Sequence, residues 1–109
     1  MSYEVIFFQT SRGDRPVQSY VYSLDKPTYS KYVRLIDVLS NYGPLISMPY
    51  SRKLTKHLSE LRTKGKNPIR IIYTLIKNQY FLLHAFQKKA QKTPSKEIQI
   101  AEKRRLTLI

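Results

Sequence analysis

The spacing of apolar side chains in residues 1–43 predicts one strand followed by two helices. Residues 3–9, with the sequence YEVIFFQ, are short, aromatic and β-branched, as strands usually are. Beyond them, apolar side chains recur at the spacing of one helix face, at Val17, Tyr20, Val21 and Leu24, and again at Tyr29, Tyr32, Val33, Ile36 and Leu39. Pro16 and Pro27 suit the first turns of these helices, and Gly43 suits the end of the second. We therefore expect a helical hairpin.

The following residues change to the patterns of strands. Residues 44–57 are expected to be mostly irregular, and residues 58–64 to form a short polar strand. Residues 69–76 (IRIIYTLI) and 80–87 (YFLLHAFQ) are rich in β-branched and aromatic side chains. Because they lie on either side of a turn at 77–79, they predict a β-hairpin.

A C-terminal helix completes the expected fold. Thr93 and Pro94 are placed to open it, with the threonine hydroxyl accepting a hydrogen bond from a first-turn N–H, and the helix runs to Arg105. The order β-α-α-β-β-β-α predicts an α+β fold in one domain, residues 1–109. Strands joined by short turns pair antiparallel, and the helical hairpin is expected to cover one face of this sheet while the other face stays partly open.

The chain is strongly basic, and its charge is unevenly distributed. Its 109 residues carry 20 Lys and Arg against 7 Asp and Glu, a net charge of +13. Residues 1–50 contribute +1 of this charge, and residues 51–109 contribute +12. A basic half beside a nearly neutral half predicts a surface that meets a polyanion, with nucleic acid favoured over a membrane surface. A solvated basic surface, or one covered by an acidic protein partner, remains the alternative.

Composition argues against several classes of function. The chain has no cysteine and only 2 histidines, and its acids show no metal-ligand spacing, so we expect no disulfide, no metal and no cofactor. No apolar segment approaches the roughly 20 residues that span a bilayer. The N-terminus has the pattern of a strand and not of a signal peptide. These features predict a soluble cytoplasmic protein that does not enter a membrane.

The strongest candidate site comes from the predicted β-hairpin. Arg70 points oppositely to Ile69 and Ile71, so it lies on the open face if those two face the helices. Lys88 and Lys89 follow the partner strand, at the end that returns beside Arg70. A guanidinium on a strand is suited to holding a phosphate with two parallel donors. Crowded cations also lower the pKa of a lysine, which can then accept a proton near neutral pH.

Other side chains are candidates for binding or chemistry. Arg62 is a supporting cation, and further contacts with a nucleic-acid backbone are expected from Lys56, Lys64, Lys66 and Lys92. Tyr73 is a candidate for stacking on a nucleotide, although most of the 9 tyrosines fit a core. His84 is a candidate general base, but its apolar neighbours make a structural histidine an equal alternative.

Three segments of the chain resemble a known family. HLSELRTKG, IRIIYTL and FLLHAFQKKAQKTPSKEIQIA, within residues 49–105, resemble the C-terminal half of HigB-type toxins of the RelE/ParE superfamily, which are often described as phage-derived toxin-like proteins. The most specific part runs from Phe86 through Lys88-Lys89 to Thr93-Pro94, because it joins a strand end, a basic cluster and a helix start in one order. The N-terminal elements are similar to the family by their order.

The resemblance implies a RelE-like fold and a role as the toxin of a type II toxin–antitoxin system. Its partner would be a helix-turn-helix antitoxin of the HigA-like kind. Its activity would be that of a ribosome-dependent endoribonuclease, or mRNA interferase, which cuts mRNA without a metal and uses the RNA 2′-hydroxyl as nucleophile. By the same resemblance, Arg70 holds the scissile phosphate and Arg62 supports it, while Lys88 or Lys89 closes the site.

The chain departs from the family pattern at two places. It lacks a catalytic C-terminal tyrosine, since only Thr93 and Ser95 lie near that position, and it lacks lysines before Leu61. RelE carries lysines just before the position of Leu61, where this chain has Leu58 and Glu60. The identity of the general base therefore stays open, and the possible substitutes are Lys56, Lys64 or Lys66. Two other functions remain as alternatives: a ParE-like toxin that poisons DNA gyrase without cutting RNA, and a plain basic nucleic-acid-binding protein.

Overall fold

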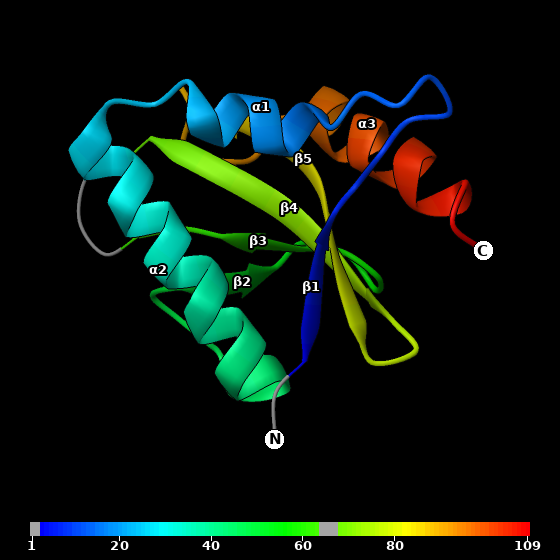
Figure 1. Cartoon of the computed structure of the whole chain (residues 1–109), viewed down its shortest axis with the longest axis horizontal. Helices are drawn as coiled ribbons and strands as arrows, with labels where there is room; N and C mark the ends of the chain where they lie inside the picture. The colour runs from blue at the N-terminus through cyan, green and yellow to red at the C-terminus, as the bar shows by residue number, and fades with distance from the viewer. Residues whose placement is uncertain (1–2, 64–67) are drawn as a thin grey trace.

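The computed structural model describes residues 3–63 and 68–109 and combines a five-stranded sheet with three α-helices (Figure 1). The elements follow one another as β1 (Glu4–Phe7), α1 (Pro16–Tyr22), α2 (Lys26–Tyr42), a short 3-10 helix η1 (Gly43–Leu45), β2 (Ser51–Lys53), β3 (Ser59–Leu61), β4 (Ile69–Ile76), β5 (Gln79–Gln87) and α3 (Ser95–Leu106). The predicted α+β class is confirmed, and this order is consistent with a RelE-like fold.

The sheet has the strand order β1-β5-β4-β3-β2. Three of its pairings are antiparallel, as expected for strands joined by short turns, whereas β1 pairs with β5 in parallel, which the sequence did not predict. β2 is a further departure, because it lies in the segment that was expected to be irregular. Its three residues are Ser51, Arg52 and Lys53, and they contain no apolar alternation from which a strand could be predicted.

Helices cover both faces of the sheet. Val17 and Val21 of α1 and Tyr32 of α2 share one apolar core with Leu61 and Ile71, and α2 crosses in front of the sheet in Figure 1. A second core, on the other face, holds Phe8, Leu58, Ile72, Leu83, Phe86 and Ala101, the last of them on α3. The face expected to stay partly open is therefore covered in part by α3.

The hairpin between β4 and β5 sets the geometry of the candidate site. Lys77 and Asn78 both have positive φ, 49° and 67°, as in the tight two-residue turns that fit the twist of a hairpin. The resulting register places Arg70 opposite Phe86, with one irregularity between Ile72 and Tyr73. At the open end, the Lys88 N–H donates to the Pro68 carbonyl at 2.6 Å, so the chain leaving β5 stays beside the start of β4.

The helix starts agree only in part with the predictions. Asp25 caps α2 by accepting a hydrogen bond from the Thr28 N–H at 3.3 Å. The expectation that Thr93 caps α3 was wrong, because Pro94 occupies the cap position and no side chain caps this helix. Val33 was expected on the buried stripe of α2, yet it is 43% exposed. No helix in the described part of the chain is long and apolar enough to cross a bilayer.

Candidate functional site

Arg70 and Lys88 face Glu60 at the free end of the hairpin, and two further arginines lie close enough to act on Lys88. The Glu60 Oε1 atom lies 3.8 Å from Arg70 Nε and 3.9 Å from Lys88 Nζ. Arg52 is the register partner of Glu60 on β2, and Arg62 shares the sheet face of Glu60 because it lies two residues further along. Both arginines act electrostatically on Lys88. We call Glu60 with Arg52, Arg62, Arg70 and Lys88 the cation cluster.

Three members of the cation cluster are buried, whereas Arg52 is exposed and Arg62 is half-buried. The Glu60 side chain is 0% exposed, and the side chains of Arg70 and Lys88 are 10% and 6% exposed. Charges removed from water interact far more strongly than charges on an open surface. One carboxylate is set against four cations, so the cluster keeps a positive surplus, and such a surplus attracts an anion.

The pKa of Lys88 lies below its ordinary value of 10.5. Burial is the largest cause, because it disfavours the charged ammonium. Arg70, Arg52 and Arg62 lower the pKa further by repulsion, whereas Glu60 acts in the opposite direction. The sequence predicted this effect from crowding alone, and the structure adds burial as the larger contribution.

Arg70 is supported from the helical layer. Its Nη1 donates to the backbone carbonyl of Ile69 at 3.0 Å, and the Tyr32 hydroxyl on α2 donates to the same oxygen. Burial raises the pKa of Tyr32 to about 12. The Tyr32 hydroxyl therefore stays protonated at neutral pH, which suits a hydrogen-bond donor and not a general base.

Thr93 contacts the second oxygen of Glu60. Its hydroxyl donates to Glu60 Oε2 at 2.8 Å, which explains why it does not cap α3. The two oxygens of Glu60 thus contact different parts of one segment, since Lys88 precedes Thr93 by five residues. We call residues 88–93, with the sequence KKAQKT, the basic segment.

A model of the phage-derived Gp49-like protein family (DUF891) matches residues 19–106, which include the whole cation cluster. The chain belongs to the Gp49-like family. This family is RelE-like and toxin-like, so the membership supports the toxin-like superfamily that the sequence predicted, though not HigB in particular. No curated protein matches the chain at a significant level.

His84 takes a structural position in this Gp49-like chain. Its Nε2 lies 2.8 Å from Glu97 Oε1 on α3, and its ring stacks on Phe86 with centroids 5.6 Å apart. Arg104, also on α3, lies 3.4 Å from His84 Nδ1 and donates to the Leu83 carbonyl at 2.7 Å. Since an arginine can only donate, Nδ1 is the acceptor and Nε2 carries the proton given to Glu97. These contacts fasten α3 to β5, which favours the structural alternative for His84.

The remaining predicted residues lie around the cation cluster or away from it. Lys89 and Lys92 are exposed on the basic segment, whereas Lys88 turns inward. Lys56 lines a pocket with Thr74, at the opposite end of β4 from Arg70. Lys64 and Lys66 lie outside the described residues.

Tyr73 does not suit the stacking role that was expected for it. Its side chain is only 6% exposed, in the core beneath the helices. Its hydroxyl is 2.6 Å from the Ser51 hydroxyl, and its ring packs edge-on against Tyr80. The ring therefore has no free face on which a nucleotide base could stack.

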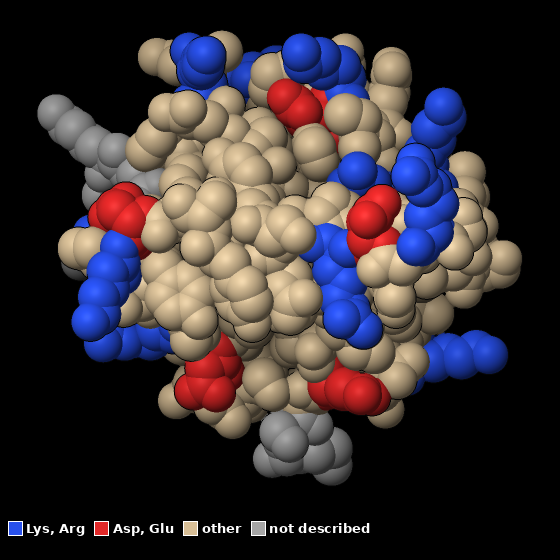
Figure 2. Space-filling view, turned by 45° about the horizontal axis from the view of Figure 1, so that its top comes forward, with Lys and Arg blue, Asp and Glu red and all other residues tan. Residues whose placement is uncertain are grey.

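Two further observations describe the charge of this Gp49-like chain. Figure 2 shows a face on which lysines and arginines lie mostly toward the edges of an uncharged central area, with acids between them. Within residues 3–63 and 68–109, no group of three or more His, Cys, Asp or Glu is placed to hold a metal ion. The donors near the cation cluster are cationic, which suits an anion and not a metal.

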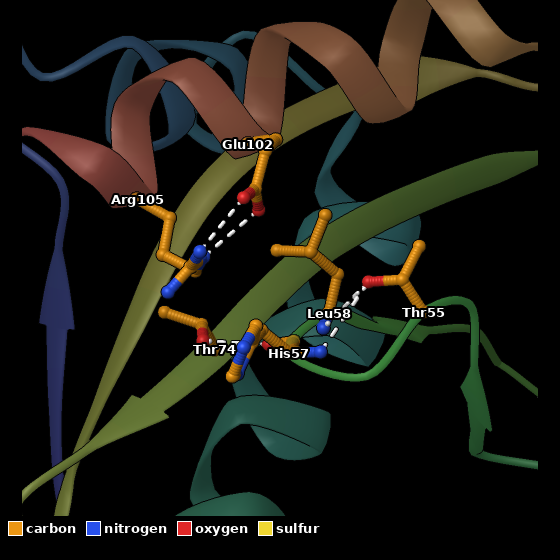
Figure 3. A network of polar contacts seen from close by, with 6 residues as sticks. All are labelled: Thr55, His57, Leu58, Thr74, Glu102 and Arg105. Carbon is orange, nitrogen blue, oxygen red and sulfur yellow. Dashed lines mark hydrogen bonds and ion pairs between the residues drawn. The ribbon is translucent and has the colours of Figure 1, made fainter.

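Figure 3 shows two separate sets of polar contacts, one within α3 and one between β4 and the loop before β3. Arg105 donates twice to Glu102, at 2.8 and 2.7 Å. The Thr74 hydroxyl donates to the His57 carbonyl at 2.6 Å, so His57 contributes its backbone to this contact and its ring stays exposed. The Thr74 contact fastens this loop to β4, and the Arg105–Glu102 ion pair lies within α3.

Four contributors to the site were missed from the sequence as partners of Arg70 and Lys88: Arg52, Glu60, Thr93 and Tyr32. Arg52 and Thr93 reach the site only through contacts between segments that are far apart in the sequence. Glu60 carried a usable signal, because alternation along its strand places it on the face of Leu58 and Arg62, opposite Leu61. An acid on that face has to find cationic partners when it is buried.

Proposed function

We propose that this Gp49-like chain is the toxin of a type II toxin–antitoxin system and acts in the cytoplasm as an mRNA interferase on the ribosome. The observation that carries the proposal is the convergence of Arg70 and Lys88, each within 4 Å of the same carboxylate oxygen. Two cations fixed beside each other suit the negatively charged oxygens of one phosphodiester group. Family membership supports the toxin, and the +12 charge of residues 51–109 supports RNA as its target.

In the proposed reaction, the RNA 2′-oxygen loses its proton and attacks the adjacent phosphorus. The bond from phosphorus to the 5′-oxygen breaks, and that oxygen takes up a proton. The products are a 2′,3′-cyclic phosphate and a 5′-hydroxyl end. Because the transition state carries more negative charge than the substrate, fixed guanidinium and ammonium groups lower its energy. Arg70 and Lys88 are assigned this role, with Arg62 as the supporting cation.

The reaction also needs groups that take and give protons. Lys88 is the group in the cluster whose pKa is lowered, so it is the candidate for giving a proton to the leaving 5′-oxygen. His84 is not used in this proposal, because both its ring nitrogens already face Glu97 and Arg104. Lys89 and Lys92 are exposed and are assigned to the RNA backbone outside the scissile phosphate.

Dependence on the ribosome follows from the near burial of Arg70 and Lys88. With 10% and 6% of their side chains exposed, these groups meet few RNA conformations in free solution. A ribosome that fixes the mRNA would supply the orientation that the isolated protein lacks. A helix-turn-helix antitoxin is the proposed partner that keeps the toxin inactive until it is needed.

The proposal is tested by inducing the protein in bacteria and mapping RNA 5′ ends. Wild-type protein is expected to arrest growth and to produce new ends within translated codons. Arg70→Ala and Lys88→Ala should lose both effects, while Arg12→Ala and Lys103→Ala, at exposed positions with the same charge change, should keep them. Growth arrest with DNA damage signalling and no RNA ends would favour gyrase poisoning instead. Harmless expression without an antitoxin would favour a plain nucleic-acid-binding protein.

A further inference from the structure

Glu60 is unusual among the charged residues of the sheet. Its side chain is 0% exposed, and an ionised carboxylate removed from water is stable only with close partners. Its partners are not symmetric, however. Oε2 accepts a hydrogen bond from Thr93 at 2.8 Å, whereas Oε1 accepts none from the described residues and faces Arg70 and Lys88 at 3.8 and 3.9 Å.

The two oxygens of Glu60 hold the two ends of the basic segment. Lys88 begins this segment and Thr93 ends it, and neither lies in a helix or strand. Between them, Lys89 and Lys92 are exposed. The Lys88 N–H adds a third attachment, to Pro68 at the start of β4. A segment without regular hydrogen bonds is thus fixed at both ends, largely through one buried carboxylate.

We propose that Glu60 is a positioning residue, which fastens both ends of the basic segment to the sheet and holds Lys88 and Arg70 side by side to receive one phosphate group. The inference rests on the proposed function for its ligand, RNA phosphate, and on the contacts above for the positioning. Glu60 does not touch the substrate in this account, because none of its side chain is exposed.

The geometry separates the two actions of Glu60. The contacts to Arg70 and Lys88 are longer than hydrogen bonds, so they act through charge. The contact to Thr93 is a hydrogen bond, which an amide oxygen can also accept. Glu60→Gln therefore removes the attraction for the cations and keeps the bond to Thr93. Thr93→Val does the opposite, and Thr93→Ser keeps the hydroxyl as a conservative control.

The first measurement is NMR titration of the lysine side chains in the whole protein, with Lys88 assigned from the spectrum of Lys88→Met. Glu60 raises the Lys88 pKa, so Glu60→Gln should shift the Lys88 titration to lower pH, while Thr93→Val should leave it closer to wild type. An unchanged Lys88 titration in folded Glu60→Gln would overturn the proposal. This readout needs no nuclease activity.

The second measurement is hydrogen exchange of the basic segment. Thr93→Val should speed exchange of the amides of residues 88–93, and Thr93→Ser should restore it. Unchanged exchange in Thr93→Val would count against the fastening of the segment. This variant keeps the Glu60 charge, so it tests the proposal even if Glu60→Gln does not fold.

The third measurement is the affinity for a fluorescent mRNA that is held on ribosomes and whose 2′-hydroxyls are replaced by hydrogen, so that it cannot be cut by the proposed reaction. Glu60→Gln should weaken binding by about 10- to 100-fold, the size of effect expected when one hydrogen bond from a cation to the phosphate is lost. Equal affinity of wild type and Glu60→Gln would overturn the role toward phosphate. If wild type binds this RNA but never cuts its ribonucleotide form on ribosomes, the proposed function fails while the positioning of Lys88 stands on the NMR result.

Discussion

Two charged clusters lie on the same face of the sheet and differ in how their charges are matched. Around His84, Glu97 and Arg104, the contacts are hydrogen bonds of 2.7, 2.8 and 3.4 Å. Around Glu60, the ion pairs are 3.8 and 3.9 Å long and cations outnumber the acid. Phe86 separates the two, since it stacks on His84 and pairs with Arg70 in the hairpin register.

This difference separates a structural cluster from a candidate site. A matched, hydrogen-bonded group holds α3 on β5 and leaves no charge for a ligand. A cation surplus in a poorly solvated place costs stability, and such groups are usual where a site has to bind an anion. We therefore propose that Arg70 and Lys88 bind an anion, whereas His84 holds α3 on β5.

The largest expected effect is on activity at the cation cluster. Arg70→Ala removes the guanidinium proposed to hold the scissile phosphate, and the loss should be about 100- to 1000-fold in the rate of mRNA cleavage, as when one transition-state donor is removed. The rate is measured with purified ribosomes and mRNA. Arg12→Ala, an exposed change of the same kind, should keep the wild-type rate. A rate within twofold of wild type for Arg70→Ala would remove this residue from the site.

The next effect is on stability at the matched cluster. His84→Ala deletes the contact to Glu97 and the stacking on Phe86, so the free energy of unfolding should fall by about 1–3 kcal/mol. Urea denaturation measures this change, and His57→Ala, at an exposed ring, is the control. The cleavage rate per folded molecule should stay close to wild type. A loss of cleavage without a loss of stability would reverse the assignment of His84.

A smaller effect is expected at the exposed lysines of the basic segment. Lys89→Ala or Lys92→Ala each removes one cation proposed to contact the RNA backbone, so affinity should fall a few-fold for all sequences. The slope of log affinity against log salt should become less steep by about 0.7 for each lost contact with single-stranded RNA. Binding isotherms at several salt concentrations measure the slope. Lys103→Ala on α3 is the control, and an equal change in that variant would show a non-specific effect.

The smallest effect concerns pH. The pKa of Lys88 is lowered in the folded protein, so between that folded value and the ordinary 10.5 the unfolded chain binds more protons. The contribution of this lysine to the free energy of unfolding therefore rises as pH rises through this window, and it is absent below the folded value. Lys88→Met should flatten the rise, as measured by denaturation from neutral to alkaline pH. Identical pH dependence in the variant would contradict the lowered pKa.

The features of the candidate site that depend on local sequence patterns were predicted from the sequence. β4 was predicted with its observed bounds, because Ile69–Ile76 is rich in β-branched side chains and flanked by turns. The approach of Arg70 to Lys88 followed from alternation along a strand and from the return of a hairpin. Strand alternation and the return of a hairpin both depend only on residues that are close together in the sequence.

The features that were not predicted depend on contacts between residues far apart in the sequence. The parallel pairing of β1 with β5 joins residues 75 apart, as in the contact of Glu4 with Gln79. Arg52 reaches the cluster only because the polar strand β2 pairs with β3. Thr93 was expected at a helix cap, but a buried carboxylate 33 residues away takes its hydroxyl.

The most direct test compares the two clusters in one assay. Purified wild type, Arg70→Ala and His84→Ala are each added to ribosomes translating a defined mRNA, and the rate of RNA cleavage is measured per folded molecule. The account predicts cleavage within codons by wild type and His84→Ala, with a loss of about 100-fold or more in Arg70→Ala. Cleavage that survives in Arg70→Ala and disappears in His84→Ala would contradict it.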